Sequence, residues 1–514
     1  MVRIIVVCVL LIFSWNCVVA AEEVTVDWND THQVIDGFGA STAWRSGITD
    51  SQADMFFSVD KGIGLSLLRN RIAPTIPATT SELSIMQKAQ ARGARVWSAP
   101  WSPPAAWKTN NDVNNGGHLL ASRYQDYANQ QAAYVDSMKS AGVNIYAISV
   151  QNEPNYAATW ESCEMSAQEL HDFIPFLYNA LAAKGLDSTK ILMPEDSHWR
   201  FDLDSTTMND PTTANMVDIL AAHNYDFGTP AVVNTHGKHL WETEVSDVYG
   251  VFDSSMTDAI VWVRRIHNFL TLAEVNAWHY WWLFCPGSYC SNNQALTGPY
   301  FSPTKRMYIL GNYSKFVRPG FRRIGVTSTG SLLVSAYKDP AGETVAIVAV
   351  NPSRAGAITA NFTLSGFGLN SVTPWITSNS LSLAQQADIS VSGSSFSYIL
   401  PANTVATLVG QALTHIRGMD IKRDNNIEIS VHPNPFNPKT VIEVSSPVSG
   451  VPVVAGIYDL QGKMVKTFTP CYITQNSGGV MRYTWDAGSR QSGIFIVKVK
   501  INKTIQTKRI TLLK

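Results

Sequence analysis

Charged residues are scarce in this sequence. Lys, Arg, Asp and Glu make up 15% of its 514 residues, against about 25% in an average globular protein. The 39 basic and 40 acidic side chains nearly cancel, which leaves a formal net charge of −1. Such a chain has no electrostatic attraction for nucleic acid or for an anionic membrane surface, so we expect neither as a partner.

Motifs for metals, nucleotides and membrane spans are also missing. No cysteine or histidine spacing resembles a zinc site, and no GxGxxG or phosphate loop stands at the first strand–helix turn. We therefore expect no metal and no organic cofactor. Beyond the N-terminus no segment reaches the roughly 18 to 20 apolar residues that a membrane helix needs, so no membrane span is predicted.

The N-terminus has the pattern of a secretory signal peptide. Arg3 precedes a short apolar run at residues 4–13, and small residues follow at Ala20 and Ala21. We predict that residues 1–20 are this signal and that the mature protein is secreted. In an oxidising compartment Cys285 and Cys290, which are close in sequence, are candidates for a disulfide. Spacing alone does not supply the geometry that such a bridge needs.

Large aromatic residues, in contrast, are abundant. The chain has 15 Trp and 18 Tyr, and 45% of its residues are hydrophobic, which excludes a disordered chain. Low charge with many flat side chains suits a surface that binds an uncharged sugar. Packing in a large core explains the same aromatics, and composition alone favours that second interpretation.

Apolar segments alternate with amphipathic helical patterns between residues 37 and 310. Eight buried strands alternating with helices predict a (β/α)8 TIM barrel over residues 37–310, with an open doubly wound sheet as the structural alternative. The strands are expected at Gly37–Ser41, Leu65–Arg71, Arg95–Ala99, Ile145–Val150, Ile191–Glu195, Ile219–Asn224, His239–Thr243 and Asn276–Trp281.

The pattern changes after residue 310. Strand-like segments separated by turn residues predict a side β-sandwich over residues 311–412, which residues 21–36 are expected to join. A polar, charged stretch at 413–426 predicts a linker. The remaining residues, 427–514, have an all-β pattern and are expected to form a separate C-terminal domain.

Two glutamates stand at the ends of predicted barrel strands, where the working residues of such barrels lie. Glu153 follows the fourth strand and Glu244 the seventh, about three βα units of roughly 30 residues later. Glycoside hydrolysis needs such a pair, one to protonate the leaving oxygen and one to stabilise or attack the anomeric carbon. A structural ion pair is the alternative for either one alone, and Glu242 on the same strand face rivals Glu244. Other acidic residues that follow strands, without a recognisable partner, are Glu195, Asp196 and Asp226.

The segment VQNEPNY, residues 150–156, resembles the Asn-Glu-Pro signature of a large clan of retaining barrel glycosidases. The segments HQVIDGFGAS, WSAPWSPP, SKFVRPG and PWITSNS accompany it. Together they resemble glycoside hydrolase family 30, particularly its bacterial xylanase branch. The resemblance covers both the barrel and the side sandwich, from about Val24 to Val409.

The resemblance implies roles for individual residues. Glu153 would be the acid/base, and Glu244, the glutamate after a threonine, would be the nucleophile in preference to Glu242. Asn152 would hydrogen-bond the 2-hydroxyl of the sugar at the cleavage point, and Trp101 would form part of the sugar-binding floor, with core packing as its alternative. Further candidates for substrate binding are Tyr156, His223, Tyr225 near the nucleophile, Trp281 with core packing as its alternative, and Tyr289.

One departure from the family concerns the segment after the eighth strand. Glucuronoxylan-specific members carry an arginine there that binds the carboxylate of a glucuronic acid branch, whereas residues 281–298 contain none. Without that cation a strong charge-assisted contact is lost. We therefore expect a retaining endo-β-1,4-xylanase with weak or no dependence on such branches. The alternatives are another family 30 glycosidase (β-1,6-glucanase, galactanase or disaccharide-releasing exo-xylanase) and a non-catalytic polysaccharide-binding protein.

The C-terminal segments HPNPFNP, IYDLQGKMV and SGIFIVKV resemble the sorting domains of Gram-negative secreted proteins. The resemblance implies a type IX secretion or cell-surface attachment signal, with the secretion machinery as its partner. The alternatives are a β-sandwich spacer and a carbohydrate-binding module. Trp485 is the only tryptophan after residue 426, which argues against the binding module.

Overall fold

The computed structural model describes residues 20–413, 428–445, 452–459, 462–468, 471–472, 480–501 and 504–514. Residues 1–19 of the predicted signal peptide and residues 414–426 of the predicted linker lie outside these ranges. The contacts divide the chain into two compact units, residues 1–414 and 415–514.

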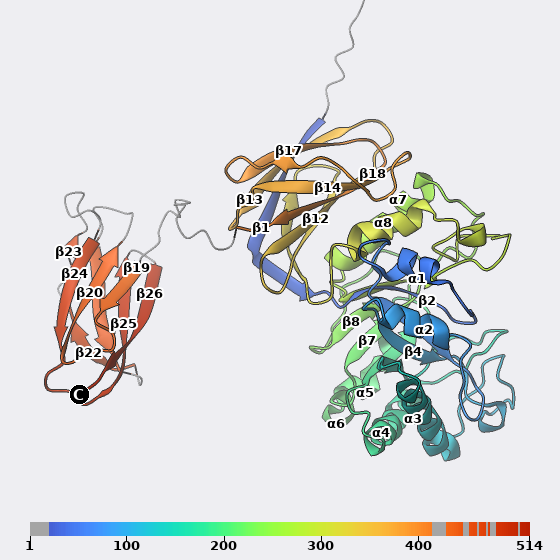
Figure 1. Cartoon of the computed structure of the whole chain (residues 1–514). Coiled ribbons are helices and arrows are strands. Elements are labelled where there is room, and N and C mark those ends of the chain that lie inside the picture. Colours follow the sequence, from blue (N-terminus) through green and yellow to red (C-terminus); the bar gives the residue numbers. More distant parts are fainter. Residues whose placement is uncertain are drawn as a thin grey trace, which may run out of the picture. The chain divides into compact units, whose positions relative to one another are not determined.

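A closed barrel of eight parallel strands forms the centre of the first unit (Figure 1). The first strand pairs with both the second and the last, which closes the barrel and excludes the open sheet. The predicted strand positions agree with the observed ones to within two residues. The strands are β2 (Gly37–Ser41), β3 (Leu67–Ile72), β4 (Arg95–Pro100), β5 (Ile145–Ser149), β6 (Lys190–Asp196), β7 (Ile219–Ala222), β8 (His239–Glu242) and β9 (Ala277–Trp282).

Helices with one apolar side pack around the outside of this barrel. Helix α4 shows why they form where they do: Ser166 and Glu169 make a capping box at its start, and Phe173 and Leu177 lie on its buried side. The α-helices are α1 (Asp50–Phe57), α2 (Leu83–Gln90), α3 (Tyr124–Ser140), α4 (Ala167–Ala183), α5 (Ser205–Asn209), α6 (Pro211–Ala214), α7 (Met256–Thr271) and α8 (Lys305–Ser314). Short 3-10 turns are η1 (Ala105–Trp107), η2 (Ala121–Arg123), η3 (Asp202–Asp204) and η4 (Pro299–Phe301).

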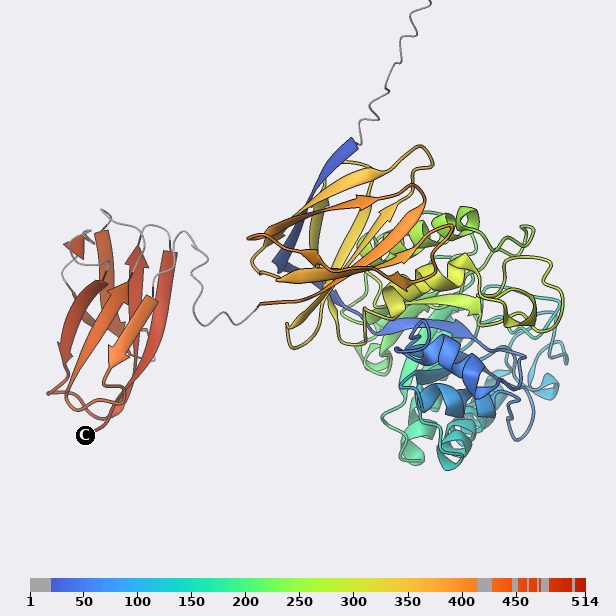
Figure 2. The same cartoon turned by 45° about the horizontal axis from the view of Figure 1, so that its top comes forward.

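The side domain is a ten-stranded sheet that encloses its own apolar core (Figure 2). Strand β1 (Ala20–Val34) joins it as predicted, antiparallel to β10 and parallel to β13, and leads directly into barrel strand β2. Asn312 on α8 bonds to Trp375 and Thr407 and so ties this sheet to the barrel. The other strands are β10 (Arg322–Ser328), β11 (Leu333–Lys338), β12 (Thr344–Asn351), β13 (Ile358–Ser365), β14 (Ser371–Thr377), β15 (Ala384–Gln385), β16 (Ile389–Ser390), β17 (Ser395–Leu400) and β18 (Thr404–Gln411).

The second unit is all-β, as predicted. Trp485 is buried there between Phe436 and Phe495, so it serves the core rather than a sugar-binding surface. One sheet has the order β19-β20-β24 and the other β22-β21-β25-β26, with β23 beside β21. The strands are β19 (Glu428–His432), β20 (Lys439–Ser445), β21 (Pro452–Tyr458), β22 (Met464–Thr467), β23 (Cys471–Tyr472), β24 (Val480–Asp486), β25 (Gly493–Ile501) and β26 (Thr504–Leu512).

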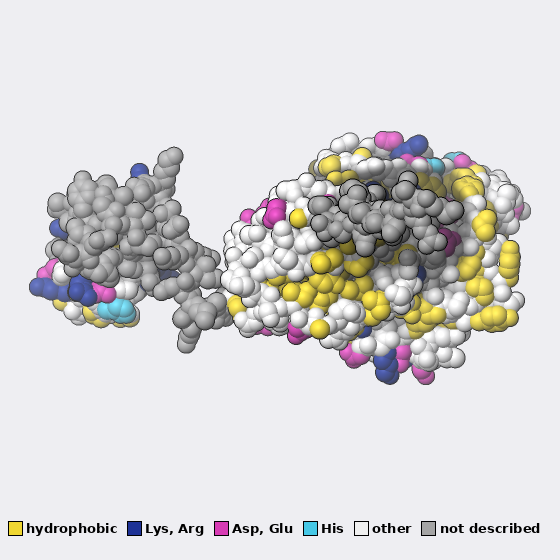
Figure 3. Space-filling model, turned by 90° about the horizontal axis from the view of Figure 1, so that it is seen from above, with side chains coloured by type: hydrophobic (Ala, Val, Ile, Leu, Met, Phe, Trp, Pro, Cys, Tyr) yellow, Lys and Arg dark blue, Asp and Glu magenta, His cyan; other side chains and the backbone are white. Residues whose placement is uncertain are grey.

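The surface of the first unit reflects the low charge of the sequence, and its helices reflect the lack of long apolar segments. On the face of the first unit seen in Figure 3, charged side chains are scattered and apolar ones gather in larger patches. Among the described residues, no helix combines the length and the apolar character that a membrane crossing requires.

Candidate active site

The structure brings Glu153 and Glu244 together at the mouth of the barrel. Glu153 follows β5 and Glu244 follows β8, which are the fourth and seventh barrel strands that the sequence predicts. Three atoms lie within 4.8 Å of one another: one carboxylate oxygen of each glutamate and one ring nitrogen of His223. The two glutamates are 8% and 5% exposed, so their charged ends sit in a largely dry site where electrostatic interactions are strong.

The backbone of Glu153 is held in an unusual conformation. Its φ is 45°, in the left-handed region that non-glycine residues seldom adopt and that costs on the order of 1–3 kcal/mol. The Glu153 amide donates to the carbonyl of Glu195 at 3.0 Å, and Pro154 stiffens the next position. This local strain fixes the direction in which the side chain leaves the end of β5.

A buried arginine, Arg69 on β3, connects the acidic groups. Its side chain is fully buried and hydrogen-bonds Glu244, Asn152 Oδ1 at 2.5 Å and Glu195 at 2.9 Å. Burial opposes the charge on Arg69, but Glu195 and Glu244 outweigh it and raise the pKa of the guanidinium. Sequence reasoning missed Arg69, although an arginine inside a strand that is otherwise buried is a readable signal of a charged partner.

His223, just after β7, lies between the carboxylates. Its Nδ1 is 3.0 Å from Glu153 and its Nε2 is 3.4 Å from Glu195. Burial lowers the pKa of His223, but the charge of Glu244 and the hydrogen bonds to Glu153 and Glu195 outweigh it and raise the pKa to about 10. His223 is therefore an imidazolium at neutral pH, and it donates to both carboxylates.

Glu195 is a functional partner that the sequence analysis set aside. The expectation that it lacks a recognisable partner is wrong, because Arg69 and His223 both bond to it. Burial favours a higher pKa for Glu195, yet these two cations lower it. The other two strand-end acids do not join this network: Asp196 accepts from the His198 amide and Asp226 from Asn224. A partner across the barrel is invisible in the sequence because it comes from a distant strand.

The environment of Glu244 suits a nucleophile. Burial raises the pKa of its carboxyl above the usual value, and the positive charges of His223 and Arg69 offset only part of that rise. Tyr225 donates its hydroxyl to Glu244 Oε1 at 2.8 Å, and Arg69 bonds to the other oxygen. Each oxygen therefore has its own donor, which fixes the orientation of the carboxylate.

Glu242, the rival nucleophile, is placed differently. It is fully buried at the end of β8, and its Oε2 accepts from the backbone amide of His279 at 3.1 Å. Burial raises the pKa of Glu242 well above the usual value. Glu242 is thus sealed from solvent, whereas Glu244 keeps 5% of its surface exposed.

Aromatic rings line the mouth beside this network. Trp101 and Trp281 belong to one apolar cluster inside the barrel and lie 5.9 Å apart between ring centroids. Trp44, which the sequence analysis did not single out, contacts Trp101 at 5.1 Å and is 37% exposed. The guanidinium of Arg69 lies 4.5 Å from the Trp101 ring. Trp101 and Trp281 thus pack within the core and at the same time lie beside Arg69.

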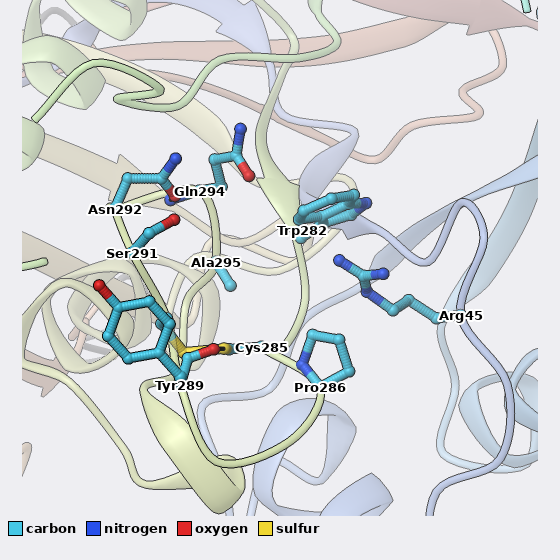
Figure 4. A pocket seen from close by; sticks show the side chains of 10 residues that line it. Arg45, Trp282, Cys285, Pro286, Tyr289, Ser291, Asn292, Gln294 and Ala295 are labelled. Carbon is cyan, nitrogen blue, oxygen red and sulfur yellow. Dashed lines mark hydrogen bonds between the residues drawn. A yellow bond between two sulfur atoms is a disulfide. The ribbon is translucent and has the colours of Figure 1, made fainter. Parts of the chain in front are cut away.

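A pocket lies beside β9, the eighth barrel strand (Figure 4). It holds about 310 Å³, and the disulfide between Cys285 and Cys290 forms part of its wall. Tyr289 stands between these cysteines and is 77% exposed. Arg45 reaches in from the β2–α1 connection, with its guanidinium 3.5 Å from the Trp282 ring. Among the described residues that line this pocket, Arg45 is the one cation.

Glu153, His223 and Glu244 have the spacing of potential metal ligands. A histidine that binds a metal must be neutral, with a free lone pair on the coordinating nitrogen. Both ring nitrogens of His223 already face carboxylates as hydrogen-bond partners, Nδ1 at 3.0 Å from Glu153 and Nε2 at 3.4 Å from Glu195. The arrangement fits proton transfer between charged side chains better than metal binding.

The sequence and the fold match known proteins over most of the first unit. Residues 66–282 match the glycosyl hydrolase family 30 TIM-barrel domain. The glucuronoxylanase XynC of Bacillus subtilis (strain 168) is 33% identical over 411 residues, which cover 76% of this chain and 92% of the relative.

Two solved structures share this likeness. The family 30 subfamily 8 xylanase Xyn30A of Clostridium acetobutylicum is 32% identical with a TM-score of 0.68, covering 76% of this chain and 99% of its own. A family 30 endoxylanase from Clostridium papyrosolvens C71 is 32% identical with a TM-score of 0.66, covering 76% and 100%.

The second unit also matches a known domain. Residues 430–512 match the secretion system C-terminal sorting domain, which marks the protein for secretion and attachment at the cell surface. This match confirms the sorting-domain prediction for the second unit. The catalytic barrel, the buried carboxylate network and the extent of the sequence match together show that this chain belongs to glycoside hydrolase family 30.

Proposed function

We propose that this protein is a retaining endo-β-1,4-xylanase, with Glu153 as the acid/base and Glu244 as the nucleophile. The observation that carries the proposal is the close approach of the two carboxylates, whose oxygens lie within 4.8 Å. Carboxyl groups about 5–5.5 Å apart are typical of retaining glycosidases, whereas inverting enzymes keep about 6.5–9.5 Å for a water molecule. Xylan is the proposed substrate because the relatives at 32–33% identity are named xylanases.

The partners of each carboxylate support this division of roles. In the first step Glu244 attacks the anomeric carbon, and Glu153 gives its proton to the glycosidic oxygen, so that the leaving chain departs as an alcohol. Arg69 and Tyr225 hold the two oxygens of Glu244 in place for this attack. In the second step Glu153 removes a proton from water, which attacks the same carbon and frees Glu244.

Neighbouring groups bind the sugar and stabilise the charge that forms on Glu153. Asn152 Oδ1 is taken by Arg69, which leaves its amide NH2 to donate to the sugar 2-hydroxyl. His223 donates to Glu153 and stabilises its carboxylate after the proton has gone to the leaving group. Trp101 and Trp281 border the sugar position as apolar walls, a role that suits the flat faces of a pyranose ring.

Replacing either catalytic carboxylate tests the proposal. Glu153→Gln is expected to lower the rate on xylan by about 10²–10⁴, the usual contribution of general acid–base catalysis, and Glu244→Gln to lower it at least as far. Glu242→Gln is the matched control, because it makes the same change two residues away in a group outside the barrel mouth. It should keep the parent rate. Reducing-sugar release measures all three. Parent-like hydrolysis by either catalytic variant would rule out the two-carboxylate mechanism.

The charge on His223 gives a pH-dependent contribution to stability. Its pKa is raised to about 10 in the folded protein from about 6.5 in the unfolded chain. Folding is therefore stabilised fully below about pH 6.5, and this contribution is lost as the pH rises through about 10. We expect the difference in melting temperature between the parent and His223→Asn to be smaller at pH 10 than at pH 6.5. Exposed His236→Asn is the control, and a gap that does not change with pH contradicts the assigned charge.

The branch requirement can be measured separately. An arginine that binds the carboxylate of a glucuronic acid branch would raise the affinity for the substrate by roughly tenfold or more, since hydrogen bonds to charged groups contribute about 1.5–3 kcal/mol. Residues 281–298 offer no arginine. We therefore expect kcat/KM on glucuronoxylan to exceed kcat/KM on arabinoxylan by less than about tenfold. Product lengths in the same assays report endo action. A larger preference for glucuronoxylan would contradict this expectation. If that preference is also lost in Arg45→Gln, the branch binds in the pocket in Figure 4.

A further inference from the structure

We propose that Tyr156 and Trp160, on the loop that follows Glu153, form an aromatic platform that binds the leaving-group side of the polysaccharide. This inference rests on the proposed function and deepens it, because it names the residues that hold sugar units beyond the cleaved bond. Trp160 has no role in the catalytic network described above.

The two rings are exposed and adjacent. Tyr156 is 45% and Trp160 is 48% exposed, and their ring centroids are 6.2 Å apart. Leaving two large aromatic side chains in water forgoes the stabilisation that burial would give them. Exposed apolar surface next to a catalytic site is typical of a ligand-binding surface.

The loop that carries the rings is fixed at both ends. The Tyr156 amide donates to the carbonyl of Glu153 at 3.0 Å, and Asn155 exchanges two hydrogen bonds with Ser197 after β6. On the other side of Trp160, Ser162 bonds to the Trp160 carbonyl at 3.2 Å. The platform is therefore positioned before any ligand arrives, which reduces the entropy lost on binding.

A line of contacts joins the platform to the mouth of the barrel. Glu161, next to Trp160, forms an ion pair with Arg71 at the end of β3. The Arg71 guanidinium lies 5.3 Å from the ring of Trp44, which in turn contacts Trp101. Side-chain contacts thus connect the loop to the Trp44–Trp101 pair beside Arg69.

The catalytic assignment decides which end of the substrate this loop meets. The acid/base protonates the oxygen of the leaving chain, so the side of the cleft next to Glu153 borders that chain. Tyr156 is three residues from Glu153 and is hydrogen-bonded to it. The faces of xylose rings carry C–H groups and no charge, which suits stacking on aromatic rings.

Two substrates separate this platform from the chemistry. Xylohexaose places sugar units on both sides of the cleaved bond, whereas β-xylobiosyl fluoride has only fluoride on the leaving side. For Trp160→Ala and Tyr156→Ala we expect kcat/KM on xylohexaose to fall about three- to tenfold more than on the fluoride, mainly through KM. Trp160→Phe and Tyr156→Phe keep an aromatic ring and should recover most of the loss. Tyr178→Ala, on α4 with the same 45% exposure, is the matched control and should show no such difference.

Each other outcome is informative. A loss on xylohexaose that lowers kcat and leaves KM unchanged would mean that these residues act through the position of Glu153, because fluoride departs without a proton and xylose does not, and it would overturn the platform. Equal losses on both substrates would place their effect on the part of the site that the two substrates share, and would overturn the platform too. No loss on either substrate would overturn it as well. If the parent hydrolyses neither substrate, the proposed function fails instead, and calorimetric binding of xylohexaose then decides: equal affinities of parent and Trp160→Ala contradict the platform, and a weaker variant supports it.

Discussion

The buried charge of Arg69 is the constraint on which the site depends. An arginine sealed inside a barrel is costly unless carboxylates pair with it, and here Glu195 and Glu244 do so. His223 adds a second positive charge between Glu153 and Glu195. Two cations therefore hold three carboxylates close together in a dry space, where the carboxylates alone would repel one another. Removing either cation would leave three buried carboxylates with a single positive charge among them.

The barrel makes this arrangement possible because its parallel strands end at one mouth. Arg69 comes from β3, and Glu195, His223 and Glu244 come from or just after β6, β7 and β8. The unequal surroundings of the carboxylates then divide the work. Glu244 has a fixed donor on each oxygen, whereas Glu153 faces His223 from a strained backbone and lies next to an exposed loop. In the proposed mechanism Glu244 is the group held for attack and Glu153 the group that exchanges protons.

Much of the fold was readable from the sequence because each barrel strand is a short apolar run between amphipathic helices. The position of Glu153 and Glu244 at strand ends was readable as well, and strand ends are where such barrels carry their chemistry. The place of Arg69 inside a buried strand signals a charged partner, but the identity of that partner and the partners of Glu195 depend on contacts between strands far apart in the chain. The same holds for Arg45, which stands on the β2–α1 connection and which only the fold brings beside residues 281–298. Patterns along the chain identify elements, whereas side-chain partners across the barrel need the folded structure.

The most direct test of the account is to trap the covalent intermediate. Incubation with 2-deoxy-2-fluoro-β-xylobiosyl fluoride slows release of the sugar from the nucleophile, and peptide mapping by mass spectrometry then locates the bound sugar. The account predicts a single adduct on Glu244, placed between Arg69 and Tyr225, and no adduct in Glu244→Gln. An adduct on Glu242 or on any other residue, or turnover of the parent through an inverted product with no adduct, would contradict it.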